Sequence, residues 1–348
     1  MRIGHVALYV GNAGDTMLID ATRKLFGYKF GKIEWIDLPL RVEWTQERVE
    51  FVNKNCDALI VGGGGLFFPG SPADSVSGWQ WNCHSSLINK IKVPSIVFAA
   101  GYNRFRGQKD FKTIFDKNLK TIIKKSCFIG IRSNGSIKRL SEYVNKRTSA
   151  NLRFQPCPTT LISKLYNIKK SEGKVCAINF AADKSKNRYG KNKSYIHETI
   201  NNICNRLISQ GWKIKLFVHR FGDGEIKEAL YCKYELVNIS RVSPEEILKE
   251  FSEIKLMIGT RGHSILISFG MQIPSLSLIS HAKLKWFLED IKNPEWGIDV
   301  RRLTADSMYR KILDIKNGNY TIKKIQKEQD FLWETSLENM EEISKCLR

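Results

Sequence analysis

The chain has 348 residues, and its 56 lysines and arginines outnumber its 35 aspartates and glutamates, which gives a formal charge of +21. Hydrophobic residues make up 42% of the chain, which excludes an intrinsically disordered protein and suffices for one or two cores. The length predicts two domains. The charge indicates that the partners are anionic.

The sequence shows neither an export signal nor the residue spacing of a metal site. The N-terminal apolar run is short, is broken by glycines and lacks a cleavage site, so we expect a cytoplasmic protein. Residues 263–282 are uncharged over the length of a membrane span, but Gly270 and Pro274 indicate a helix that ends before a buried strand. The eight cysteines form no CxxC pair, which predicts reduced thiols and no metal.

The positive charge is concentrated in residues 104–193, which contain 23 basic and 5 acidic side chains. This predicts a basic surface that faces an anionic substrate, an anionic membrane or nucleic acid, although a solvated lysine-rich surface has the same composition. Within the segment, residues 111–125 have a basic amphipathic pattern. Such a helix lies on an anionic membrane or packs on a core, and we favour the core.

Strand-like and helical patterns alternate through the first part of the chain. Strands are expected at residues 3–10, 33–38, 58–61, 95–99 and 128–131, and helices at residues 16–26, 79–91, 109–125 and 134–147. This alternation predicts a mostly parallel sheet that is covered by helices on both faces.

Residues 154–174 break the alternation with two prolines and a lysine-rich run, and predict a linker. The pattern then restarts, with strands expected at 175–180, 213–218, 235–239, 256–259 and 275–279 and helices at 194–210, 223–232, 262–269 and 281–291. Ser243, Pro244 and Glu246 predict the capping box of one further helix.

These patterns predict an α/β protein with two domains that face a cleft. The predicted boundaries are an N-terminal domain at 1–155, a linker at 156–174, a C-terminal domain at 175–300 and a helical tail at 301–348.

The glycine-rich segment 11–15 lies at the first predicted strand-to-helix junction. Free N–H groups at such a helix start can hold a phosphate or carboxylate. Ala13 and Thr16 exclude the dinucleotide-binding fingerprint. A tight turn capped by Asn12 and Asp15 is an equally good interpretation.

Four consecutive glycines, which include Gly63 and Gly64, follow the strand-like segment that ends at Val61. At the carboxyl end of a strand they predict a ligand that approaches the backbone closely. Tyr102 and Asn103 end the next predicted strand and either line the same crevice or form a surface loop.

Cationic side chains follow several later strands. Arg132 can grip an anion through two hydrogen bonds, although a surface arginine has the same pattern. His219 is predicted to face the cleft. Arg261 and His263 open a helix where an anion would be held, and a histidine there can act as a general acid or base or can simply be buried. Lys283 adds a charge at the same sheet edge.

Taken in order, six segments resemble the polysaccharide pyruvyl transferase family. They are GNAGDTMLIDA (11–21), DALIVGGGGLF (57–67), PSIVFAAGYN (94–103), FIGIRSNGSIKRL (128–140), PCPTTL (156–161) and GTRGHSILISFGMQIPSLSLISHAKLKWFLEDI (259–291). The resemblance implies two Rossmann-like domains, similar to the B-type glycosyltransferase fold. Two positions depart from the family pattern: Ser133 stands where an acidic residue is usual, and Gly262 stands where a bulky apolar residue is common.

The resemblance implies that the pyruvyl group of phosphoenolpyruvate is transferred onto two hydroxyls of a sugar, which forms a cyclic ketal in a cell-surface polysaccharide and releases phosphate. It implies His263 and Arg132 as catalytic residues. The donor-binding residues that it implies are Arg132, His219, Arg261, Ser264 and Lys283, and the acceptor-binding residues are Asn12, Asp15, Gly63, Gly64, Tyr102 and Asn103.

The scheme requires no cofactor besides phosphoenolpyruvate as co-substrate. The expected acceptor is a sugar or a lipid-linked oligosaccharide at the cytoplasmic face, so the basic segment 104–193 can contact the anionic inner face of the plasma membrane peripherally. A B-type glycosyltransferase that uses a nucleotide sugar is the alternative function. No nucleic-acid-binding motif is recognisable, so we expect no nucleic acid partner.

Overall fold

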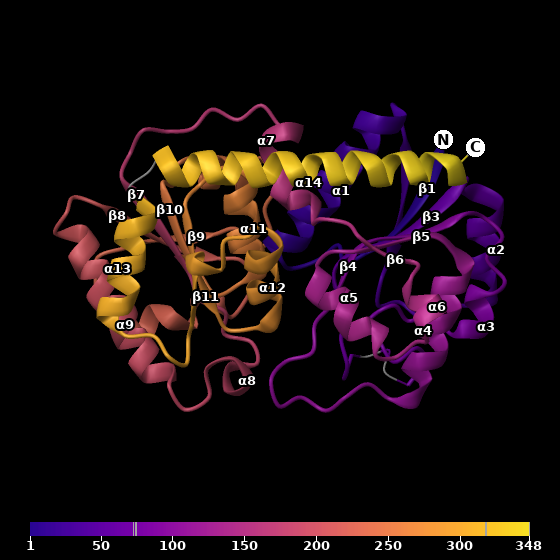
Figure 1. The fold of residues 1–348 in the computed structure, drawn as a ribbon, viewed down its shortest axis with the longest axis horizontal. Helices are drawn as coiled ribbons and strands as arrows, with labels where there is room; N and C mark the ends of the chain where they lie inside the picture. Colours follow the sequence, from indigo (N-terminus) through magenta and orange to yellow (C-terminus); the bar gives the residue numbers. More distant parts are fainter. Residues whose placement is uncertain (72, 74, 317–318, 348) are drawn as a thin grey trace. The chain divides into compact units, whose positions relative to one another are not determined.

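The computed structural model describes residues 1–71, 73, 75–316 and 319–347 and divides the chain into two compact units (Figure 1). The first unit comprises Met1–Tyr9, Leu18–Pro158 and Leu332–Arg348, and the second comprises Val10–Met17 and Thr159–Phe331. The predicted N-terminal domain ended at residue 155, close to this division. The short segment 10–17 groups with the second unit, and the predicted tail is shared between both units.

The first unit is built on a six-stranded parallel sheet in the order β2-β1-β3-β4-β5-β6. Its strands are β1 (Arg2–Ala7), β2 (Glu34–Pro39), β3 (Ala58–Phe67), β4 (Ser95–Tyr102), β5 (Ser126–Ile131) and β6 (Leu152–Phe154). The helices in this part of the chain are α1 (Ala13–Phe30), α2 (Gln46–Asn55), α3 (Ser85–Ile88), α4 (Thr113–Lys125), α5 (Asn134–Ser141) and α6 (Lys146–Ser149). Every residue of β4 is buried, as expected for a central strand with both faces covered.

The second unit contains another six-stranded parallel sheet, in the order β12-β11-β10-β7-β8-β9. Its strands are β7 (Val175–Asn179), β8 (Lys213–Val218), β9 (Glu235–Asn238), β10 (Leu256–Gly259), β11 (Ser275–Ile279) and β12 (Gly297–Asp299). This is the Rossmann strand order, and it reverses between β7 and β10. The predicted α/β class with two parallel sheets is therefore confirmed.

Helices and 3₁₀ segments precede, connect and follow the strands of the second sheet. They are η1 (Pro158–Leu161), α7 (Ile162–Leu165), α8 (Ser185–Tyr189), α9 (Lys193–Ile208), η2 (Asp223–Ala229), α10 (Pro244–Ser252), α11 (Gly262–Gly270), α12 (Ala282–Asp290), η3 (Pro294–Trp296), α13 (Ala305–Lys316) and α14 (Asn319–Cys346). α10 begins with the predicted capping box of Ser243 and Glu246. α9 packs beside α13 (Figure 1). The guanidinium of Arg206 lies over the ring of Tyr309 between these two helices.

The predicted helix at 79–91 is wrong, because only Ser85–Ile88 is helical in that range. Trp79 stacks on Phe67 with ring centroids 4.8 Å apart and donates from Nε1 to Asn118 Oδ1 at 2.6 Å. Packing of the indole rings therefore overrides the helical pattern.

The predicted helix at 223–232 is the shorter 3₁₀ segment η2. β6 and β12 have three residues each, too few to show a periodic pattern.

The basic amphipathic helix α4 packs its apolar face into the first unit. Phe115, Leu119 and Ile122 are buried, which confirms the core-packing interpretation of residues 111–125.

Residues 263–282 contribute most of α11 and the whole of β11, rather than one long helix. Among the described helices, none combines the length and the apolar character that crossing a membrane requires.

Candidate functional site

The second sheet brings residues that follow β7 and β10 together where the strand order reverses. Asn179 ends β7, and its carbonyl oxygen accepts the N–H of Thr260 at 3.1 Å. Its side-chain Oδ1 accepts the N–H of Arg261 at 3.3 Å. In open parallel sheets, ligands bind at the carboxyl ends of the strands at such a reversal. We call this region the switch-point site.

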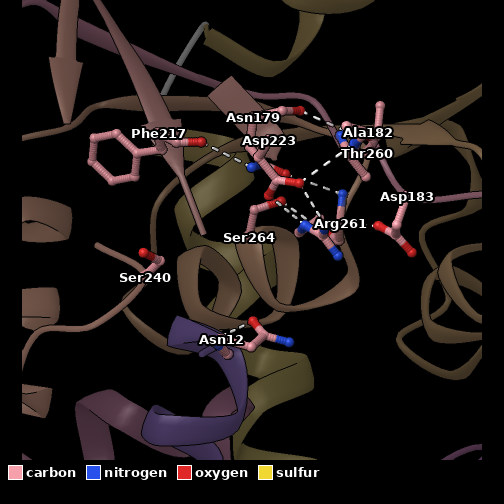
Figure 2. A network of polar contacts seen from close by, with 12 residues as sticks. Asn12, Asn179, Ala182, Asp183, Phe217, Asp223, Ser240, Thr260, Arg261 and Ser264 are labelled. Carbon is pink, nitrogen blue, oxygen red and sulfur yellow. Dashed lines mark hydrogen bonds and ion pairs between the residues drawn. The ribbon is translucent and has the colours of Figure 1, made fainter. Parts of the chain in front are cut away.

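Arg261 is held between two carboxylates, as Figure 2 shows. Its Nε and Nη2 atoms donate to the two oxygens of Asp223 at 2.5 Å each, and Nη2 also donates to Asp183 Oδ1 at 2.6 Å. Burial opposes the charge of Arg261, but hydrogen bonding to Asp223 outweighs it and raises the pKa of the guanidinium above its ordinary value. Only Nη1 is left for a ligand within the described part of the chain.

Asp183 lies among three cations. It accepts from Arg188 at 3.2 Å, and Arg188 in turn donates to Ser280 Oγ at 3.0 Å. Burial alone would raise the pKa of Asp183, but the charges of Arg188, Arg261 and Lys283 outweigh it and hold that pKa well below its ordinary value. Counting Asp223, three cations face two carboxylates, so the switch-point site has a formal excess of one positive charge.

Lys283 lies against the start of α11. A Cβ atom placed on Gly262 would lie 3.4 Å from Lys283 Cε. Gly262 departs from the family pattern, and its missing side chain leaves room beside the stem of Lys283. Arg261, the N-cap residue of α11, makes no side-chain hydrogen bond that caps this described helix, and the helix dipole favours an anion at this end.

The structure also shows a histidine that the sequence reasoning missed. His281 is 1% exposed and caps α12, because its Nδ1 accepts the N–H of Lys283 at 3.0 Å. This hydrogen bond places the proton of the neutral imidazole on Nε2. The predicted helix at 281–291 included His281 as its first residue, whereas α12 begins at Ala282 and His281 is its N-cap.

His263 packs directly against the start of α1, within the second unit. A Cβ atom on Gly14 would lie 2.5 Å from His263 Cβ and would collide with the imidazole ring. Only glycine allows this close approach. The predicted phosphate-binding role of the segment 11–15 gave no indication of this contact.

The N–H groups at the start of α1 are already satisfied. Ala13 donates to the carbonyl oxygen of His219 at 2.9 Å, and Gly14 donates to Asn12 Oδ1 at 3.0 Å. Asn12 Nδ2 donates to Asp15 Oδ2 at 2.9 Å, and the Asp15 N–H donates back to the Asn12 carbonyl oxygen at 3.0 Å. The expectation of free N–H groups is therefore wrong, and Asn12 caps the start of α1 as the alternative interpretation predicts, while Asp15 accepts from the Asn12 amide.

His219 and Ser264 are buried beneath the switch-point site instead of facing a cleft. The His219 ring lies edge-on to Phe251 at 5.9 Å, and among the described residues neither ring nitrogen has a hydrogen-bond partner. Burial and the charge of Arg261 lower the pKa of His219 to about 3. Ser264 Oγ donates to the Arg261 carbonyl oxygen at 2.8 Å and so stabilises the turn that precedes α11.

The first unit holds the remaining candidates. Arg132 follows β5 and lies along β4, because a Cβ atom on Gly101 would meet Arg132 Cζ at 2.8 Å. Ser133, the second departure from the family pattern, caps α5 by accepting the N–H of Ser136 at 3.2 Å. A helix cap therefore occupies the position where an acidic residue is usual.

The glycines at 62–65 lie inside β3, so the predicted end of this strand at Val61 is wrong. Gly62 and Gly64 pair with residues of β4. A Cβ atom on Gly62 would lie 3.0 Å from the carbonyl carbon of Phe98 and would collide with its oxygen. On Gly63 it would lie 3.1 Å from Leu18. Close packing of β3 on β4 thus explains why position 62 requires a glycine.

Tyr102 and Asn103 at the end of β4 differ in accessibility. Tyr102 is 2% exposed, and the guanidinium of Arg139 lies 5.6 Å from its ring centroid. Asn103 is half-buried and packs on Gly65, where a Cβ atom would lie 2.7 Å from its amide. Tyr102 is therefore a core residue, whereas Asn103 retains some exposed surface.

Comparisons with known proteins agree with this architecture. A family model described as polysaccharide pyruvyl transferase matches residues 12–281, and no curated protein matches significantly. The UDP-GlcNAc 2-epimerase from Neisseria meningitidis bound to UDP-GlcNAc is similar, with 11% identity, a TM-score of 0.55, and coverage of 97% of this chain and 100% of that chain.

Two further solved structures show the same likeness. The UDP-GlcNAc 2-epimerase from Methanocaldococcus jannaschii has 10% identity and a TM-score of 0.53, and the match covers 92% of this chain and 94% of that chain. A glycosyltransferase from Rickettsia africae has 14% identity and a TM-score of 0.58, with coverage of 100% and 98%. These identities show the fold alone, and they confirm its similarity to the B-type glycosyltransferase class.

Proposed function

We propose that this chain, which belongs to the polysaccharide pyruvyl transferase family, transfers the pyruvyl group of phosphoenolpyruvate onto two hydroxyls of a sugar and releases phosphate. The observation that carries the proposal is the grouping of Lys283, His263 and the uncapped start of α11 where the second sheet reverses its order. Such a site suits a small ligand with both a phosphate and a carboxylate.

In this proposal, Lys283 and the first-turn N–H groups of α11 bind the phosphate or carboxylate of the donor. Asp183 and Asp223 accept hydrogen bonds from Nε and Nη2 of Arg261. Arg261 therefore chiefly fixes the turn that carries His263, and it offers only Nη1 to the donor. His219 and Ser264 support this turn from beneath, because both are buried. In the first unit, Arg132 and Asn103 are the partly exposed candidates for substrate contact.

The reaction needs one proton at the vinyl CH₂ carbon. At the neighbouring carbon it forms two new C–O bonds to the sugar and breaks the C–O bond to phosphate. We assign the proton to His263, because imidazole titrates near working pH and this ring lies beside the uncapped start of α11. The first sugar hydroxyl then attacks, phosphate leaves with its oxygen, and the second hydroxyl closes the ketal. Of the two hydroxyl protons, one replaces the proton that His263 gave and the other leaves with phosphate.

The acceptor in this proposal is a sugar or a lipid-linked oligosaccharide at the cytoplasmic face of an anionic membrane. The formal charge of +21 supports a peripheral electrostatic contact with such a surface. The basic segment 104–193 is divided between the two units at Pro158, so the lysines of both units would contribute to the contact.

The function is tested by mixing the protein with phosphoenolpyruvate and neutral glycans in heavy water and following phosphate release. We expect release that depends on a glycan, with one deuterium in the methyl group of the ketal. His263→Gln should abolish release while phosphoenolpyruvate still raises the melting temperature. Phosphate release without a glycan-bound pyruvyl group would contradict the proposal.

A further inference from the structure

A second polar cavity opens in the second unit, outside the switch-point site. It has a volume of about 290 Å³ and lies between the first turns of α9 and the end of η2. Its lining consists of Ser194, His197, Glu198, Asn201, Ala229 and Tyr231.

One buried side chain preorganises the cavity. Asn201 is 1% exposed, and its amide donates to the Ala229 carbonyl oxygen at 2.7 Å and to the His197 carbonyl oxygen at 3.2 Å. Its Oδ1 accepts the N–H of Tyr231 at 3.0 Å. Asn201 therefore fixes the end of η2 on α9 and holds the cavity open without a ligand, which lowers the entropy cost of binding.

The groups that remain for a ligand are polar but carry little charge. His197 Nε2 is enclosed and makes no hydrogen bond in the described part of the chain. Burial and the charge of Lys193 lower the pKa of His197, so its imidazole is neutral near pH 7. Ser194 and Glu198 are exposed, and the ring of Tyr231 is 73% exposed.

This combination discriminates between classes of ligand. An anion is disfavoured because Glu198 is the only charged side chain in the lining. A metal cation is disfavoured because the lining offers one carboxylate and one imidazole, and the described residues contain no group of three possible metal ligands. A neutral ring with many hydroxyls suits the carboxylate, the imidazole and the hydroxyl of Ser194, while its apolar face can lie on Tyr231.

We propose that this cavity binds a neutral sugar residue of the acceptor glycan, at a distance from the reacting sugar. The identity of the ligand as an acceptor rests on the proposed function. η2 begins at Asp223, which holds Arg261, and ends at Ala229 in the cavity wall. A 3₁₀ segment of this length spans at most about 12 Å, which an oligosaccharide can bridge and a single sugar cannot.

The test measures binding of neutral oligosaccharides built from galactose, glucose, mannose and N-acetylhexosamines, together with the parent monosaccharides. Saturation-transfer NMR and calorimetry are applied to the wild type, Tyr231→Ala and Glu198→Gln. Tyr195→Ala is the matched control, because Tyr195 is 49% exposed on the same helix but does not line the cavity. We expect both cavity variants to weaken oligosaccharide binding about tenfold or more, and the control to leave it unchanged.

The same variants separate this inference from the proposed function. In transfer assays, the cavity variants should raise KM for the oligosaccharide with little change in kcat, and should retain the rise in melting temperature with phosphoenolpyruvate. Oligosaccharide binding that is equal in all four proteins, or absent from the wild type across the panel, would overturn the inference. Loss of the phosphoenolpyruvate response in the wild type would instead overturn the proposed function.

Discussion

The position of His263 depends on the absence of a side chain at Gly14. We predict that Gly14→Ala forces the imidazole out of its place, abolishes most of the transfer activity and costs about 1–3 kcal/mol of unfolding free energy. The matched control is Gly27→Ala on the same helix, because no atom lies within 4 Å of the added carbon at that position. This substitution should stabilise α1 by about 0.5–1 kcal/mol. Phosphate release and urea unfolding measure both effects. Full activity in Gly14→Ala would show that His263 is not held in this way.

The buried ring of His219 predicts a pH dependence of stability. Its pKa is lowered from 6.5 to about 3 in the folded protein. Between these values the unfolded chain binds a proton that the folded chain excludes, so stability is lost as pH falls below 6.5. His219 contributes a slope of about 1.4 kcal/mol per pH unit, in addition to the contribution of the buried His5, whose pKa is lowered to about 4. In urea unfolding between pH 5 and 6.5, His219→Leu should reduce the slope by this amount, and an unchanged profile would refute the assignment.

The sequence alone predicts some residues of the switch-point site but not others. Arg261 and His263 follow a strand directly, so their place at the sheet edge follows from the strand pattern. Asp183 comes from a loop and Asp223 from the start of η2, at sequence separations of 78 and 38 residues from Arg261, and no local pattern indicates that they pair with it. The sequence alone suggested that Arg261 binds the anionic donor. In the structure, most of its hydrogen bonds go to Asp183 and Asp223 instead.

At the scale of elements, β3 shows that a run of glycines has two structural interpretations. A glycine run after a strand is typical of a ligand-binding turn, but here the strand continues and β4 packs against it. Backbone approach between strands requires glycine for the same steric reason as approach to a ligand. The sequence alone cannot distinguish approach between strands from approach to a ligand.

By contrast, β8, β10 and β11 have the predicted bounds, because buried parallel strands are continuous apolar runs.

The two glycines at the centre of β3 should therefore respond differently to the same substitution. Gly62→Ala places a carbon against the Phe98 carbonyl group and should cost more than about 3 kcal/mol, or prevent folding. Gly63→Ala meets the flexible Leu18 side chain at 3.1 Å and should cost only about 1–2 kcal/mol. Urea unfolding compares the two proteins. Equal stability combined with a shared loss of acceptor binding would favour the ligand-binding interpretation.

At the scale of the whole molecule, the excess of basic residues predicts binding to anionic vesicles that weakens as salt is raised. Three exposed lysines of α4, Lys117, Lys120 and Lys124, should contribute about 1 kcal/mol each near the membrane surface. Their triple substitution by Gln should weaken sedimentation with these vesicles. A matched triple, Lys285→Gln, Lys323→Gln and Lys327→Gln, removes the same charge outside residues 104–193 and should weaken it less. Equal effects would contradict a role for the basic segment.

The class of fold could be predicted from the alternation of strands and helices, whereas the grouping of separate stretches of the chain into one unit could not. The segment 10–17 joins the second unit through the hydrogen bond from Ala13 to His219, and α14 contributes residues to both units. Both features depend on contacts between distant parts of the chain. Linear boundaries read from composition cannot represent them.

The central claim is that the switch-point site binds phosphoenolpyruvate, and the most direct test is the melting temperature with and without this ligand. We predict a rise for the wild type that is lost in Lys283→Gln. Lys285→Gln should retain the rise, because Lys285 lies on the same helix but is exposed and paired with Glu289. No rise with phosphoenolpyruvate, together with a clear rise with uridine or guanosine diphosphate, would contradict the claim and indicate a nucleotide-sugar glycosyltransferase.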